Sequence, residues 1–130
     1  MYQEKPTLAY WMSSVLYGGF IEEVMLRLFV MSLIALVAWK LFFRKQEKIP
    51  VGVLVFANII SAVLFAAGHL PATLQMFGEI TPLILLRCFL LNGAGGLVFG
   101  FLYRKYGIHY SMLAHAGAHI VWKIIWVLFA

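Results

Sequence analysis

Charged residues are scarce in this 130-residue chain, and aspartate is absent altogether. Charged side chains make up 12% of the sequence, whereas a soluble domain typically carries about 25%. Apolar residues account for 64%. This composition excludes a disordered chain and fits a soluble globular domain poorly, because no polar segment is long enough to cover a soluble surface. A protein embedded in a membrane is the class that we expect.

Cysteine and clustered positive charge are also scarce. The single cysteine, Cys88, lies in an apolar stretch, so an internal disulfide and a cysteine-rich metal site are excluded and a core position is expected. The ten Lys and Arg residues outnumber the five acids, but they are scattered along the chain and argue against nucleic-acid binding. Their excess is typical of loops that set membrane orientation and contact lipid headgroups.

Four long apolar stretches predict helices, because backbone polar groups in lipid must be satisfied internally. We expect a lead-in helix over residues 8–19, followed by spanning helices at about 20–43, 50–69, 82–103 and 110–129. The predicted fold is therefore all-α: a polytopic transmembrane bundle of about four spanning helices plus the lead-in helix. Because no loop is long enough to separate domains, residues 1–130 are expected to form a single domain.

Local signals predict how these spans begin, end and pack. Pro71 is expected to end the second span, and Thr81 is expected to cap the third. Gly96 and Gly100 are four residues apart, a spacing that allows close approach of helices. His109 is expected in the turn before the last span.

Ionisable side chains inside spans are costly and are functional candidates for that reason. The candidates here are Glu22, Glu23, Arg27, His69, Arg87, His115, His119 and Lys123. Glu23 and Arg27 are spaced i, i+4, so we expect them to pair on one helix face. Glu22 lies about 100° away around that helix and has no partner nearby in the sequence. The alternative is that both glutamates mark a helix N-terminus.

The histidines are also spaced to meet. His115 and His119 lie at i, i+4 among small residues, which suits a metal site or a bound water, although a structural pair is the alternative. Glu22 lies about 22 residues before Arg44 and His69 about 21 after Lys48, so antiparallel helices should bring these two side chains to one depth. On its own, His69 would be an interface or capping residue.

Three ordered motifs carry a family resemblance: Glu22-Glu23-x-x-x-Arg27, then Phe65-x-x-x-His69, then His115 with a polar residue four positions later. Over residues 17–123 the chain resembles the CPBP family, the CAAX-protease and bacteriocin-processing membrane enzymes that are also called the Abi family. The resemblance implies a helical membrane fold and an intramembrane endopeptidase. Some bacterial relatives are linked to bacteriocin maturation or self-immunity.

The same resemblance implies roles for individual residues. Glu22, His69 and His115 match the family's catalytic positions, and Glu23 with Arg27 matches its supporting pair; Phe65 belongs to the second motif. His119 departs from the family, which usually has Asn or Asp there, and it is a further catalytic candidate. The short length leaves three interpretations open, namely a minimal version, a fragment, or one subunit of a homo-oligomer.

The predicted mechanism is hydrolysis of a peptide bond by an activated water. Glu22 with His69 would activate the water and pass its proton on, while His115 and His119 would hold the water or stabilise the oxyanion. A metal-assisted version places Zn²⁺ on His69 and His115 with Glu22 or His119. No other cofactor is expected. The expected substrate is a membrane-associated peptide or protein, and the expected location is a bacterial cell membrane.

Two other classes remain open. One is a non-catalytic bacteriocin-immunity or scaffold protein with the same fold, and the other is a small transporter subunit that uses the charges as an ion path. The basic turns at 44–48 and 104–105 should share one side, which the charge bias makes cytoplasmic. Straight helices would then place His115 nearer to that side than Glu22. The prenyl-protease relatives work from the cytosolic side, so the charge bias and the resemblance disagree on sidedness.

Overall fold

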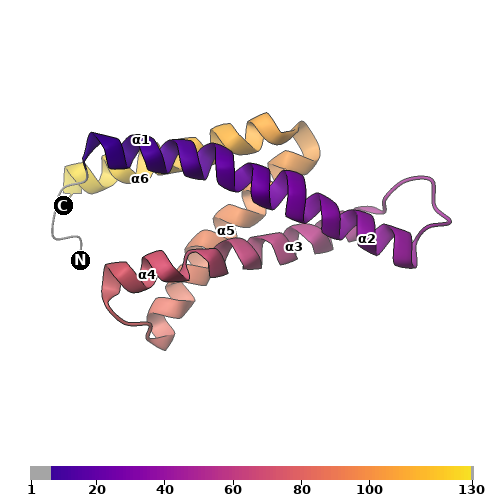
Figure 1. Cartoon of the computed structure of the whole chain (residues 1–130), viewed down its shortest axis with the longest axis horizontal. Helices are drawn as coiled ribbons and strands as arrows, with labels where there is room; N and C mark the ends of the chain where they lie inside the picture. Colours follow the sequence, from indigo (N-terminus) through magenta and orange to yellow (C-terminus); the bar gives the residue numbers. More distant parts are fainter. Residues whose placement is uncertain (1–6, 130) are drawn as a thin grey trace.

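The structure, a computed structural model, describes residues 7–129, and within this range the chain is helical apart from short turns. The helices are α1 (Leu8–Leu16), η1 (Tyr17–Glu22), η2 (Val24–Met31), α2 (Ser32–Phe42), α3 (Val51–Gly68), α4 (Leu70–Phe77), α5 (Pro82–Tyr106) and α6 (Ile108–Phe129) (Figure 1). None of the described residues forms a strand. The all-α prediction is confirmed.

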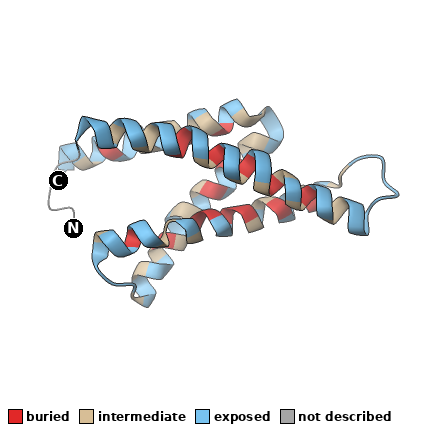
Figure 2. Ribbon diagram, in the orientation of Figure 1, coloured by how far each residue is buried: buried red, intermediate tan, exposed pale blue. Residues whose placement is uncertain are grey.

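Four helical stretches are long and apolar enough to cross a membrane: Leu8–Phe42, Val51–Phe77, Pro82–Tyr106 and Ile108–Phe129. Many of their large apolar side chains are exposed, and the buried positions follow the faces that the helices turn toward one another (Figure 2). So much exposed apolar surface would be a liability in water, but it matches the hydrocarbon of a bilayer. The chain is therefore a polytopic membrane bundle.

The predicted lead-in and first span join into one helical stretch of 35 residues, about 53 Å long at 1.5 Å per residue. This exceeds the roughly 30 Å thickness of a bilayer's hydrocarbon core. Wider π-helical turns, η1 and η2, occupy its middle; such turns often occur at functional sites. Gly18 and Gly19 do not break the helical stretch, and both are buried. A Cβ on Gly19 would lie 2.7 Å from Ala116 Cβ, so the glycine allows close approach to α6.

The end of the second span differs from the prediction. Pro71 does not end the helical structure but lies in the first turn of α4, where a missing backbone N–H does no harm. His69 is the joint between α3 and α4. The chain leaves α4 at Gly78, whose φ of 79° suits glycine. Thr81 caps α5 as expected, accepting a hydrogen bond of 3.3 Å from the backbone N–H of Ile84.

The turn between α5 and α6 is shorter than predicted. Gly107, with φ 104°, joins α5 to α6 by itself, so His109 lies in the first turn of α6 rather than in a loop. His109 is exposed, as expected. Figure 1 also shows that the α5–α6 turn reaches less far along the bundle than the α2–α3 loop does.

Small residues set the close contacts between α3 and α5, which pack extensively on each other. A Cβ on Gly96 would lie 3.0 Å from Ala62 Cα, and one on Gly100 would collide with Asn58. The expectation of close approach at these two glycines is confirmed. Cys88 is buried, also as expected. In the first half of α3, Val53 and Ala57 form a small apolar core with Met31 and Ala35 of the first helical stretch.

Candidate active site

A fully buried carboxylate, Glu23, is the hub of the bundle's polar interior. Its Oε1 accepts a hydrogen bond of 2.8 Å from His115 Nδ1. Its Oε2 accepts one of 3.3 Å from Arg27 Nε and another from Ser111 Oγ. The predicted i, i+4 pair of Glu23 with Arg27 is therefore present, and two partners from α6 join it.

Arg27 is buried as completely as Glu23 and extends the hub to α3. Its Nη1 donates to Ser61 Oγ at 2.7 Å, and Ser61 Oγ donates in turn to the carbonyl of Leu26 at 2.9 Å. Its guanidinium lies 5.5 Å from the centre of the Phe65 ring. Such additional bonds stabilise a buried ion pair, although Arg27 Nη2 is buried without a hydrogen-bond partner among residues 7–129. The network joins three helical segments to one another.

Contacts with neighbouring aromatic rings, as well as the bond to Glu23, fix the position of the His115 ring. It is 3% exposed and stacks between Phe99 and His119, with ring centres 4.5 and 5.0 Å away. Phe65 packs edge-on against it at 5.2 Å. Because an ionised carboxylate only accepts hydrogen bonds, the Glu23 contact places the imidazole proton on Nδ1. In the neutral imidazole Nε2 is then an acceptor.

Glu22 lies on the other side of His115, where its Oε2 is 3.8 Å from His115 Nε2. That separation is too long for a direct hydrogen bond. The Glu22 side chain is 22% exposed, yet Oε2 itself is buried and has no hydrogen-bond partner among residues 7–129. The structure thus brings Glu22 and His115 together although straight helices predict different depths. The difference arises from the long first helix and from the set-back α5–α6 turn (Figure 1).

His69 reaches the site from the α3–α4 joint. Its Nδ1 donates to the carbonyl of Phe65 at 2.8 Å, which leaves Nε2 as an acceptor. Within the described chain no hydrogen bond joins His69 to Glu22 or His115. Instead, His69 and Glu22 line a cavity of about 210 Å³, which agrees with the predicted common depth.

His119 completes the group of histidines. Lys123 Nζ, on a side chain that is almost fully buried, lies 3.5 Å from His119 Nδ1 and can donate to it. That contact favours the tautomer with a proton on Nε2, so His119 can donate a hydrogen bond there. A Cβ on Gly18 would collide with His119 Nε2 and would lie 3.3 Å from His115 Nε2. The missing side chain of Gly18 therefore lets the His119 ring lie against the first helix, close to His115.

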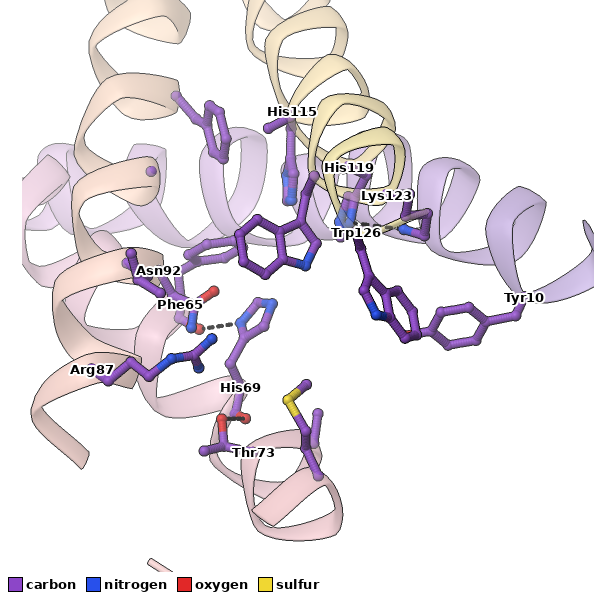
Figure 3. A pocket seen from close by; sticks show the side chains of 17 residues that line it. Tyr10, Phe65, His69, Thr73, Arg87, Asn92, His115, His119, Lys123 and Trp126 are labelled. Atoms are coloured by element: carbon purple, nitrogen blue, oxygen red, sulfur yellow. Dashed lines mark hydrogen bonds between the residues drawn. The ribbon is translucent and has the colours of Figure 1, made fainter. Parts of the chain in front are cut away.

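A second cavity, of about 400 Å³, lies beside these histidines (Figure 3). His69, His115 and His119 contribute to its wall, together with Phe65 and Phe99. The other lining residues are Tyr10, Ala72, Thr73, Met76, Arg87, Leu91, Asn92, Gly95, Ala118, Trp122, Lys123 and Trp126. This volume is within the range of small-ligand sites, and the cavity is lined mostly by apolar and aromatic groups, as such sites usually are.

The metal-assisted version requires three protein ligands for Zn²⁺. Among residues 7–129, no group of three or more His, Cys, Asp or Glu side chains is arranged to hold a metal ion. His69 and His115 each use Nδ1 in a hydrogen bond, as histidine ligands commonly do, so Nε2 of each ring is the atom that would face an ion. As they stand, the described side chains do not form a three-ligand zinc centre.

The sequence did not single out Ser61 or Ser111, which complete the buried network. Their only signal is a hydroxyl group within an apolar span, and serine is common there because it can bond to its own helix. Lys123 lies four residues after His119, a spacing that places the two side chains on one helix face, whereas nothing in the sequence connects Arg87 to the histidines.

Residues 4–121 of the 130 match a protein family described as Rce1-like, type II CAAX prenyl endopeptidase. The chain belongs to this family of CAAX-type membrane proteases, which confirms the resemblance drawn from its three motifs. No curated protein is significantly similar to the chain, and neither is any solved structure.

Proposed function

We propose that this chain is an intramembrane endopeptidase that hydrolyses a peptide bond of a membrane-associated peptide with a water activated by Glu22. One observation carries the proposal. Glu22 Oε2 has no partner in the described chain and lies 3.8 Å from the accepting Nε2 of His115. Two acceptors at this separation can each receive one O–H bond of the same water molecule, and a bridging water satisfies both.

The remaining residues supply the other requirements of hydrolysis. The water oxygen attacks the carbonyl carbon as Glu22 takes a water proton, which gives a tetrahedral intermediate. The Nε2–H of His119 donates to the oxyanion of that intermediate. Glu22 then delivers its proton to the amine nitrogen as the C–N bond breaks. His69 lines the same cavity as Glu22 and limits where the water can lie; both O–H bonds of the water are used by Glu22 and His115, so His69 accepts none from it.

The buried hub has a positioning role in this scheme. Glu23 fixes the tautomer and the orientation of His115, as a carboxylate commonly does for a working histidine. Arg27 and Ser111 donate to that carboxylate in an apolar interior, and Ser61 accepts a hydrogen bond from Arg27. Preorganised groups that do not need to move are the ones that stabilise a developing charge most effectively.

The experiment is a comparison of peptide termini in bacterial membranes that express the native chain or the Glu22→Gln variant at equal levels. Glu47→Gln, in the exposed α2–α3 loop, is the matched control. New termini should appear with the native chain and with the control, and should be lost with Glu22→Gln. If a folded Glu22→Gln chain yields the same termini as the native chain, the peptidase proposal fails. The non-catalytic immunity or scaffold protein then becomes the better account.

A further inference from the structure

Lys123 is a cation inside the last span, and its side chain is only 4% exposed. An ionisable group at such a place is costly and is a functional candidate for that reason. Among residues 7–129, no carboxylate lies within ion-pair distance of Lys123 Nζ. Nζ lies 3.5 Å from His119 Nδ1 and 5.6 Å from the centre of the Tyr10 ring. The steps of hydrolysis described above give this buried lysine no part.

The contact between Lys123 and His119 constrains the imidazole. A lysine ammonium has three donors and no acceptor, so it suits His119 Nδ1 only while that nitrogen carries no proton. The ring proton then lies on Nε2. A hydrogen bond of 3.5 Å is long, but the positive charge acts in the same direction, because the Nδ1 lone pair attracts it and an N–H at that position would repel it.

The three histidines of the site differ in this respect. His69 Nδ1 donates to a backbone carbonyl, and His115 Nδ1 donates to the Glu23 carboxylate, each at 2.8 Å. In both neutral rings Nε2 is left as an acceptor. The Nδ1 of His119, in contrast, faces a donor. Lys123 thus accompanies the one ring of the three whose Nε2 carries the proton.

We propose that Lys123 is a positioning residue that holds His119 in the tautomer with its proton on Nε2, the donor that the oxyanion requires. This inference rests on the proposed peptidase function and deepens it. The proposed hydrolysis needs an accepting nitrogen toward the water, on His115, and a donating nitrogen toward the oxyanion. In the other tautomer His119 Nε2 would turn a lone pair toward the oxyanion and would repel it, and a wrong tautomer is known to disable a catalytic site.

Helix geometry and the first helical stretch keep this pair aligned. Lys123 follows His119 by four residues, so the two side chains lie on one face of α6. Both line the 400 Å³ cavity, and Figure 3 shows them beside each other. The Tyr10 ring, from α1, stabilises the ammonium as an aromatic face does for a cation. It does so without a counter-charge that would compete with His119.

The competing explanation is that Lys123 serves only to bind an anionic ligand, since it lines the cavity itself. In that case the tautomer of His119 does not depend on the lysine. Loss of the lysine would then raise KM and leave kcat unchanged, whereas loss of a positioning residue lowers kcat. The tautomer and the kinetics therefore separate the two explanations.

The first measurement is ¹⁵N NMR of the purified full chain in detergent, with its four histidines labelled. The ¹⁵N shifts of an imidazole distinguish a bare nitrogen from one that carries a proton. We expect His119, assigned by the signals lost in His119→Leu, to show a bare Nδ1 and a protonated Nε2. Lys123→Met removes the charge and should give a mixture of both tautomers. Lys123→Arg should keep the native tautomer, because a guanidinium also only donates.

Lys105→Met is the matched control. Lys105 also belongs to a spanning helix and its Nζ also lies near aromatic rings, those of Phe101 and Tyr106, but it does not line the cavity. This variant should leave the His119 spectrum unchanged. A proton on His119 Nδ1 in the native chain, or a native His119 spectrum in Lys123→Met, overturns the proposal.

Steady-state kinetics supply the second readout. Lys123→Met should lower kcat by about tenfold to a hundredfold with little change in KM, a smaller loss than removal of an oxyanion donor. In the His119→Leu background the same substitution should lower kcat by less than about twofold, because no tautomer is left to select. An equal loss of kcat in both backgrounds, or a loss confined to KM, overturns the positioning role.

The two proposals fail in different ways. A His119 tautomer that does not depend on Lys123 removes only the role of the lysine and leaves hydrolysis by Glu22 intact. Absence of cleavage by the native chain removes the peptidase function, yet the NMR measurement needs no cleavage and still decides whether Lys123 sets the tautomer.

Discussion

Glu23 Oε1 and His115 Nδ1 lie 2.8 Å apart although 92 residues separate them in the chain. This bond joins the first spanning helix to the last and leaves His115 Nε2 free to face Glu22. Glu23 is thus the residue that connects the fold of this bundle to its chemistry.

Replacing Glu23 should therefore destabilise the whole bundle. Glu23→Gln leaves the Arg27 charge buried without its counter-charge, and breaking a buried pair in this way typically costs about 3–5 kcal/mol. We expect a large drop in the thermal unfolding midpoint in detergent. The double variant Glu23→Gln with Arg27→Met should recover part of the loss. A single variant as stable as the native chain would contradict the role of Glu23 as the hub.

Gly18 should be essential for activity because of the space that it leaves. In Gly18→Ala the added Cβ meets the Nε2 atoms of His119 and His115, so one ring must move. We expect cleavage to fall by roughly tenfold to a hundredfold, as is common when a catalytic group is displaced by about 1 Å. Gly117→Ala, on α6 with nothing within 4 Å of its Cβ, is the control and should remain active. Equal activity of the two variants would show that the rings tolerate the Cβ.

His119 should act as a hydrogen-bond donor. His119→Asn keeps a donor at a position where the family usually has Asn or Asp, and should retain cleavage within about tenfold. His119→Leu removes the donor and should lose about a hundredfold to a thousandfold in kcat, the usual cost of removing an oxyanion donor. Steady-state kinetics of both variants decide this. A Leu variant with native kcat rules out the oxyanion role.

Removal of divalent metal should leave cleavage intact. The described histidines and carboxylates do not form a three-ligand group, and the mechanism proposed for Glu22 uses no ion. The measurement is the cleavage rate of the purified chain before and after dialysis against a chelator, with zinc added back as the control. Loss of cleavage that zinc restores would establish the metal-assisted version.

Much of the fold follows from the sequence. Hydropathy locates the four spans, because lipid allows few structures other than helices, and Thr81 marks the start of α5. The turns were less predictable. Pro71 does not end the helical structure, since a proline disrupts a helix interior but not a first turn. The depth of His115 depends on how far the α5–α6 turn is set back from the α2–α3 loop. Tertiary packing decides that distance.

The candidate site follows from the sequence only in part. Spacing within one helix predicts the pairing of Glu23 with Arg27. It does not predict that His115 bonds to Glu23 as well as facing Glu22, because rotation of α6 about its own axis decides that. Ser61 and Ser111 carry no charge and give no signal until their helices meet the hub.

The most direct test of the account measures the chemistry of Glu22 on a purified peptide substrate in ¹⁸O-labelled water. The native chain should cleave the peptide and place one ¹⁸O atom in the new carboxylate. Glu22→Gln should slow cleavage by about a thousandfold, in the range for loss of a general base, while Glu79→Gln in the exposed α4–α5 loop should not. Cleavage by a folded Glu22→Gln variant at the native rate would contradict the account.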